Sequence, residues 1–82
     1  MIQLQLIKGD FSKTEAQDLI TQLIHVKIRF HEDKIRNTEN EEDIKMRESR
    51  IKQLQKDLYE LRNELHSTGT SVSLHSTIEI SK

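Results

Sequence analysis

The chain has 82 residues, of which 33% are charged, with a net charge of −1 and no cysteine. This length supports a single domain over residues 1–82, and the composition argues against a disulfide framework and against a polyanion-binding surface. The first residues lack a basic segment followed by an apolar run, and no stretch approaches 18 apolar residues. We therefore expect no signal peptide, no membrane association and a cytoplasmic location.

A strand is predicted over about residues 2–7, where apolar side chains alternate with two glutamines. The alternating apolar residues are Ile2, Leu4 and Leu6. Gly9 and Asp10 then interrupt the strand pattern. Ser12 stands three residues before Glu15, which is the spacing of a capping box, so a helix is predicted to begin there.

The helix predicted over about residues 12–36 has two rows of apolar side chains, rotated by about 100° from each other. The first row consists of Ala16, Leu19, Leu23, Val26 and Phe30. The second row consists of Ile20, Ile24, Ile28 and Ile35. An ordinary surface helix has one apolar face, so this helix is expected to contact its partner helix and a further surface. That further surface is either the sheet of the same chain or a second subunit.

The segment after the first helix has no apolar side chain, and Thr38 and Glu41 repeat the capping-box spacing. We predict a turn over about residues 37–40 and a second helix over about residues 40–66, with Gly69 as its stop signal. Apolar residues at steps of three and four form a seam along this helix. The seam consists of Ile44, Ile51, Leu54, Leu58, Leu61 and Leu65, with Arg47 as a polar interruption. Its four leucines are expected to face the first row, at Leu19, Leu23, Val26 and Phe30.

One continuous coiled-coil helix is the alternative, because the first row and the seam share one heptad register. The register passes through Asp33, Asn37 and Asn40, and neither Gly nor Pro lies between Ser12 and His66. Three polar seam positions in succession are costly in a coiled coil, so the antiparallel hairpin is favoured.

The last predicted element is a strand over about residues 72–80, after a Ser/Thr/Gly loop at residues 67–71. A frayed polar tail is the alternative. An antiparallel hairpin brings both strands to its open end, where they can pair, so the predicted fold is mainly α in the order β-α-α-β. A two-stranded ribbon is marginal alone. We therefore expect a homo-oligomer, a dimer or a tetramer, in which a dimer has four helices in one bundle and four strands in one sheet.

The sequence contains no recognisable catalytic or ligand-binding motif. His25 and His31 are six residues apart and point in different directions on a helix, and no thiolate is present, so no metal site is predicted. The chain has two glycines, no glycine-rich phosphate loop, and carboxylates that lie in solvent-facing acidic runs. We expect no enzymatic activity, no cofactor and no small-molecule substrate.

The sequence favours a non-catalytic protein–protein interaction or oligomerisation module that acts through helix packing. Residues expected at a helix or oligomer interface are Leu19, Ile20, Leu23, Ile24, Val26, Ile28, Phe30, Ile51, Leu54, Leu58, Leu61 and Leu65. The alternative is a small dimeric DNA-binding regulator, because basic residues precede the leucine seam, an order that invites comparison with basic-zipper proteins. This candidate nucleic-acid patch consists of Lys45, Arg47, Arg50, Lys52 and Lys56. The basic run is short and acidic residues precede it, so a protein partner is preferred.

Overall fold

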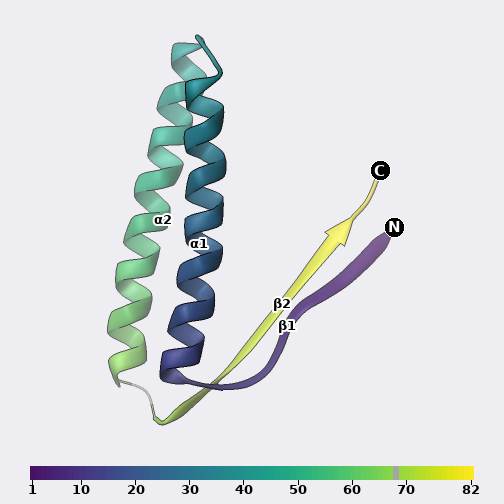
Figure 1. Ribbon diagram of the computed structural model, residues 1–82, viewed down its shortest axis with the longest axis vertical. Helices are drawn as coiled ribbons and strands as arrows, with labels where there is room; N and C mark the ends of the chain where they lie inside the picture. The colour runs from purple at the N-terminus through teal and green to yellow at the C-terminus, as the bar shows by residue number, and fades with distance from the viewer. Residues whose placement is uncertain (68) are drawn as a thin grey trace.

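The computed structural model, described for residues 1–67 and 69–82, has the predicted order β-α-α-β (Figure 1). Its elements are β1 (Ile2–Ser12), α1 (Lys13–Arg36), α2 (Glu41–Ser67) and β2 (Ser71–Ile80). The helices form an antiparallel hairpin, and the strands pair at its open end. The hairpin is therefore confirmed, whereas the continuous rod and the frayed tail are wrong. The loop predicted after α2 includes Thr68, which lies outside the described residues.

Helix α1 begins at the predicted capping box. The backbone N–H of Glu15 donates to Oγ of Ser12 over 3.1 Å, and the backbone N–H of Ser12 donates to Oε1 of Glu15 over 3.0 Å. The N–H that donates to the carboxylate lowers the pKa of Glu15. A helix start leaves its first N–H groups without partners inside the helix, and the capping box pairs two donors at this end. It therefore fixes the point where β1 becomes α1.

Helix α2 begins at a different cap from the predicted one. Oδ1 of Asn40 accepts from the backbone N–H of Asp43 over 3.0 Å, and Oγ1 of Thr38 accepts from the backbone N–H of Asn40 over 3.2 Å. Thr38 therefore shapes the turn, and Asn40 caps the helix. Thr and Asn are both common N-cap residues. The capping-box spacing of Thr38 and Glu41 pointed to Thr38, whereas Asn40 is the residue that caps α2.

The contact between His31 and Arg47 shows which sides of the two helices meet. Nδ1 of His31 and Nη1 of Arg47 lie 3.1 Å apart. On α1, residues three and four positions from His31 lie on its side of the helix, and the apolar ones among them are Ile28 and Ile35. On α2, Arg47 shares its face with the leucine seam. The second row of α1, made of isoleucines, therefore packs against α2.

The expectation that the seam leucines face the first row is consequently wrong. The isoleucines of the second row are half-buried, and Leu58 and Leu65 of the seam are buried. In the first row, by contrast, Leu23, Val26 and Phe30 are 41%, 60% and 53% exposed. The two rows are similarly apolar and lie about 100° apart, so only one of them can face a single partner helix. Phe30 of the first row has the Arg47 guanidinium of α2 5.8 Å from its ring centroid, and the rest of the row is left for another contact.

Strands β1 and β2 form an antiparallel ribbon in which Ile2 is opposite Ile80 and Ser12 is opposite Ser71. β1 is longer than predicted, because Gly9 and Asp10 do not end it and both pair with β2. Gly9 has a φ of +149°, a conformation that residues with a side chain rarely adopt. Gly9 therefore allows an irregular backbone conformation within the strand and does not form a turn.

The ribbon and the hairpin diverge from the end where they meet, so the chain has the shape of a V (Figure 1). The molecule measures 46 × 34 × 13 Å and its radius of gyration is 15.4 Å. A compact chain of this length has a radius of gyration of about 12 Å. In the described part of the chain, α1 packs against both strands and α2 does not, so α1 forms one arm of the V's inner surface.

Candidate protein-interaction groove

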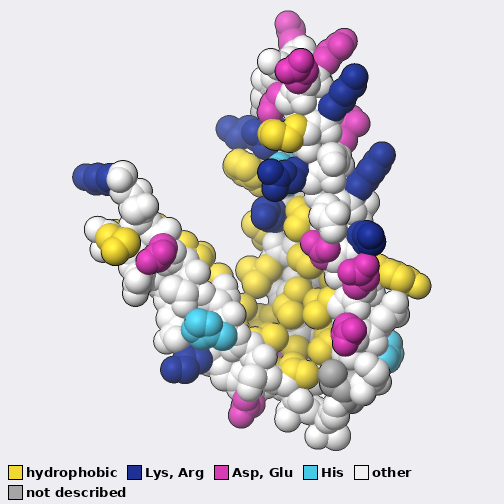
Figure 2. All heavy atoms as spheres, turned by 180° about the vertical axis from the view of Figure 1, so that it is seen from behind, with side chains coloured by type: hydrophobic (Ala, Val, Ile, Leu, Met, Phe, Trp, Pro, Cys, Tyr) yellow, Lys and Arg dark blue, Asp and Glu magenta, His cyan; other side chains and the backbone are white. Residues whose placement is uncertain are grey.

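The angle between α1 and the ribbon is an apolar groove, which we call the V groove. Figure 2 shows hydrophobic side chains gathered in this angle. At its closed end, two small hollows of about 130 Å³ and 190 Å³ lie between the two walls. Their lining residues are Leu6, Ile7, Leu19, Ile20, Gln22, Leu23, Leu74, His75 and Ser76.

The first row of α1 forms one wall of the V groove. Leu19 and Leu23 line the hollows at the closed end. Val26 and Phe30 continue the same row toward the hairpin tip, where the ribbon has diverged and their side chains are exposed. This wall therefore changes from a contact with the ribbon into a solvent-exposed apolar strip.

The inner face of the ribbon forms the other wall. Side chains alternate between the two faces of a strand, so Ile78 and Ile80 share the face of Leu74, which lines a hollow. Ile2 and Leu4 stand opposite Ile80 and Ile78 and lie on the same face. All four of these outer residues are exposed. The second wall is therefore mainly apolar, with Ser76 as its polar position on β2, and it is uncovered at its open end.

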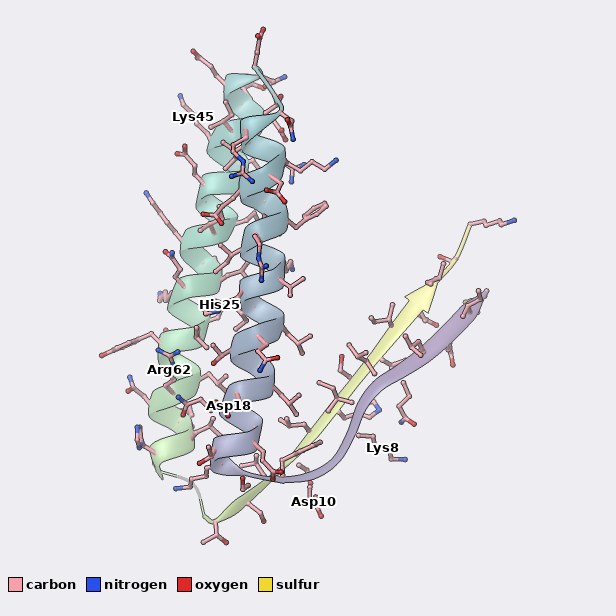
Figure 3. All side chains as sticks on the ribbon, viewed as in Figure 1. Lys8, Asp10, Asp18, His25, Lys45 and Arg62 are labelled. Carbon is pink, nitrogen blue, oxygen red and sulfur yellow. The ribbon has the colours of Figure 1, made fainter. Side chains whose placement is uncertain are left out.

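The opposite face of the ribbon is polar. Figure 3 shows Lys8 and Asp10 on this outer side, directed away from the hairpin. Nε2 of Gln3 donates to Oε1 of Glu79 over 3.0 Å, and Oγ of Ser73 donates to a carboxylate oxygen of Asp10 over 2.6 Å. The ribbon thus has a polar face that suits contact with solvent and an apolar face that suits packing against another apolar surface.

The structure divides the predicted interface residues between two surfaces. Ile24 and Ile28 belong to the row that packs against α2, and the seam residues of α2 face them. Ile20 belongs to the same row and also lines the smaller hollow of the V groove. Leu19, Leu23, Val26 and Phe30 belong to the V groove instead. The inner face of the ribbon was not assigned to an interface from the sequence. The alternation of apolar and polar residues that forms this face is nevertheless present at both ends of the chain.

The candidate nucleic-acid patch does not form one surface. At about 100° per residue, Lys45, Lys52 and Lys56 fall in one line on the side of α2 opposite the seam, and all three are exposed. Arg47 lies within the seam and is half-buried. Arg50 lies beside the seam, near His31 of α1. The five basic residues are therefore distributed over two sides of the helix.

Arg47 makes an interhelical contact that the sequence pattern did not indicate. Its Nε lies 3.2 Å from Oδ2 of Asp43 and its Nη1 lies 3.1 Å from Nδ1 of His31. Arginine can only donate, so the ring nitrogen of His31 accepts, which requires a neutral ring protonated on Nε2. Burial, followed by the charges of Arg47, Lys27 and Arg50, lowers the pKa of His31 in agreement with this geometry.

The groove carries little chemistry. The hollows are smaller than ordinary ligand pockets of about 300–1,000 Å³, and His75 is the one ionisable residue among those that line them. Among residues 1–67 and 69–82, no cluster of three histidine or carboxylate side chains could hold a metal ion. Neither helix in that part of the chain has an apolar stretch long enough to cross a membrane.

Comparisons of the chain with protein families, with curated proteins and with solved structures found no match.

Proposed function

We propose that this protein is a non-catalytic protein–protein interaction module and that the V groove is its binding surface. The single observation that carries the proposal is the exposure of apolar side chains along both walls of the groove. Exposed apolar side chains scattered singly are ordinary, but a contiguous apolar surface is typical of a protein interface. The proposal retains the cytoplasmic location expected from the sequence.

The surface area supports the same proposal. A folded monomer of 9.7 kDa is expected to expose about 5,100 Å². This chain exposes 6708 Å². The excess of about 1,600 Å² per chain is larger than the roughly 800 Å² that each partner buries in an interface of standard size. A partner seated in the groove would bring the exposed area toward that of an ordinary folded protein.

The walls favour a protein partner over nucleic acid. They are apolar, whereas nucleic-acid interfaces are strongly positive and contact phosphates through lysine and arginine. The basic residues of α2 lie on two different sides of the helix and outside the groove. A small DNA-binding regulator was the alternative expected from the sequence, and no observation at the groove favours it.

The proposal is tested by replacing two groove residues that are each more than half exposed in the single chain. Val26 and Phe30 are largely exposed, so the double variant V26S/F30S should keep its helical circular dichroism. Tyr59 is an exposed aromatic residue on α2, outside the groove, and Y59S is the matched control. Sedimentation velocity of each protein measures self-association, and affinity capture from cell extract measures binding to other proteins.

We expect V26S/F30S to lose association that the native chain and Y59S both retain. The change should remove apolar contact from one wall. Between the helices it removes the contact of the Phe30 ring with Arg47, while the isoleucine row stays packed against α2. Equal association by all three proteins, in both measurements and with equal helical content, would contradict the proposal.

A further inference from the structure

The two edges of the ribbon differ in their readiness to pair with another strand. In the described part of the chain the sheet has two strands, so each strand has one neighbour and one open edge. An open edge is a template for pairing unless a bulge, a charge or a proline protects it. The composition and regularity of each strand therefore indicate which edge is available.

The edge of β1 is protected. Its pairing with β2 is irregular between Gln5 and Ile7, where the register skips Leu6. Gly9 adds a backbone conformation with φ +149° a few residues later. Lys8 and Asp10 place two charges on the same strand. A bulge and charges are the devices by which natural edge strands avoid further pairing.

The edge of β2 is unprotected. All ten residues from Ser71 to Ile80 pair with β1 in unbroken succession. The strand contains no proline, and Glu79 is its one acidic or basic residue apart from His75. It is also rich in the β-branched residues that favour strands. This edge is therefore regular, long and nearly uncharged.

We propose that β2 pairs in antiparallel fashion with β2 of a second copy, which gives one four-stranded sheet in the order β1-β2-β2-β1. This inference rests on the proposed function and names the partner in the V groove as the same chain. Homodimers are generally closed by a twofold axis, and an isologous contact uses the same surface on both copies. A twofold axis perpendicular to the sheet keeps both apolar faces on one side.

The apolar residues of β2 indicate the register. With the axis at Ser76, Leu74 stands opposite the partner's Ile78 and Val72 stands opposite the partner's Ile80. Moving the axis to His75 would place Leu74 opposite the partner's Ser76 instead. Apolar cross-strand pairs stabilise a sheet more than mixed ones do, so the pairing is centred on Ser76.

This pairing would cover the exposed part of both walls. Because the two β2 strands run in opposite directions, the start of the partner's β2, beside its hairpin, lies next to the open end of this ribbon. Both hairpins stand on the apolar face of the common sheet, and their first rows, with Val26 and Phe30, point toward the twofold axis. The two copies together have an excess surface of about 3,200 Å², within the range buried by obligate homodimers.

Disulfide trapping tests this inference directly, because the chain has no cysteine of its own. In the S76C variant the two new thiols face each other across the axis, at a separation that a disulfide can span. In the T77C control, each Thr77 position stands opposite the partner's His75, and the two cysteines are about 8 Å apart at Cα, beyond disulfide reach. Cysteines placed singly along β1 report pairing through the other edge.

We expect the native chain to sediment at twice 9.7 kDa and oxidised S76C to become largely covalent dimer, while T77C remains largely uncrosslinked. Crosslinking through β1 and not through Ser76 would overturn the pairing of β2. A native monomer that still captures another protein through Val26 and Phe30 would overturn the second copy as partner but leave the proposed function standing. A monomer without groove-dependent capture would contradict both proposals.

Discussion

Nη1 of Arg47 donates to Nδ1 of His31 over 3.1 Å, and this contact joins the two helices in the half of the hairpin nearer the turn. The acceptor nitrogen of the ring must be unprotonated for the contact to form. Arg47 also lies 3.2 Å from the carboxylate of Asp43, one turn away on its own helix. A positive side chain at a seam position is thus held by one acceptor on each helix.

The neutral state of His31 predicts a pH dependence of stability. In the folded chain, burial and the charges of Arg47, Lys27 and Arg50 lower the pKa of His31 below its unfolded value of about 6.5. In the interval between the two pKa values the unfolded chain binds more protons. The free energy of unfolding should therefore fall as the pH falls below about 6.5, and this loss should end below the folded pKa. Urea unfolding from pH 5 to pH 8 measures it.

The variant H31Q keeps an acceptor for Arg47 but cannot titrate, so it should lose this part of the pH dependence. H25Q removes an exposed histidine from the same helix and is the control. Identical pH profiles for H31Q and the native chain would show that His31 does not carry the effect.

Removal of the N-terminal cap of α1 should destabilise the chain. In S12A, the N–H of Glu15 loses the hydroxyl that accepts from it. Loss of such a cap typically costs about 1 kcal/mol, a substantial part of the stability of a small domain. Thermal unfolding followed by circular dichroism measures the change. S49A, at an exposed position within α2, is the control and should unfold at or slightly above the native temperature.

Truncation of Leu58 should be among the most costly single changes in the hairpin. The buried apolar residues of the described chain are Ala16, Leu58 and Leu65. Replacement of a buried leucine by alanine generally costs about 2–5 kcal/mol. We expect L58A to lose most of its helical signal at a denaturant concentration where the native chain is folded. M46A shortens an exposed side chain of the same helix and should unfold close to the native midpoint; equal midpoints for the two variants would contradict the packing described for the seam.

Substitution of Gly9 should weaken the ribbon. An alanine would have to adopt φ +149°, a conformation nearly confined to glycine, at a cost on the order of 1–3 kcal/mol. G69A is the matched control, because a Cβ at Gly69 would meet no atom within 4 Å. Amide hydrogen exchange should show faster exchange in β1 and β2 of G9A than in those of G69A. Unchanged protection in G9A would mean that the bulged strand can relax around a side chain.

The order of the elements was predictable because each depends on a short-range pattern. Alternation over Ile2, Leu4 and Leu6 predicted β1, and the Ser12–Glu15 spacing located the start of α1 within one residue. β1 was predicted too short because Gly9 and Asp10 resemble a turn, whereas pairing with β2 continues across them. That pairing joins residues more than sixty positions apart, beyond the reach of a local pattern.

The facing of the helices was not predictable in the same way. The rows that contain Ile24 and Val26 are comparably apolar, so the sequence permits either one to face α2. The polar residue that decides the matter, Arg47, was interpreted as an interruption of the seam, although a long side chain can bury its stem and bring its charged end to a partner. Its partner His31 lies on the other helix, and nothing in the spacing along one helix links the two.

The opposition of Ile2 and Ile80 brings the two ends of the chain out of the ribbon side by side (Figure 1). A short linker could therefore join Lys82 to Met1 and close the backbone into a ring without disturbing the fold. Such a ring would restrict the unfolded chain far more than the folded one and would raise the stability accordingly. New ends could then be opened in the turn near Thr38, which would convert the protein into a circular permutant with a central β-hairpin and a helix at each end.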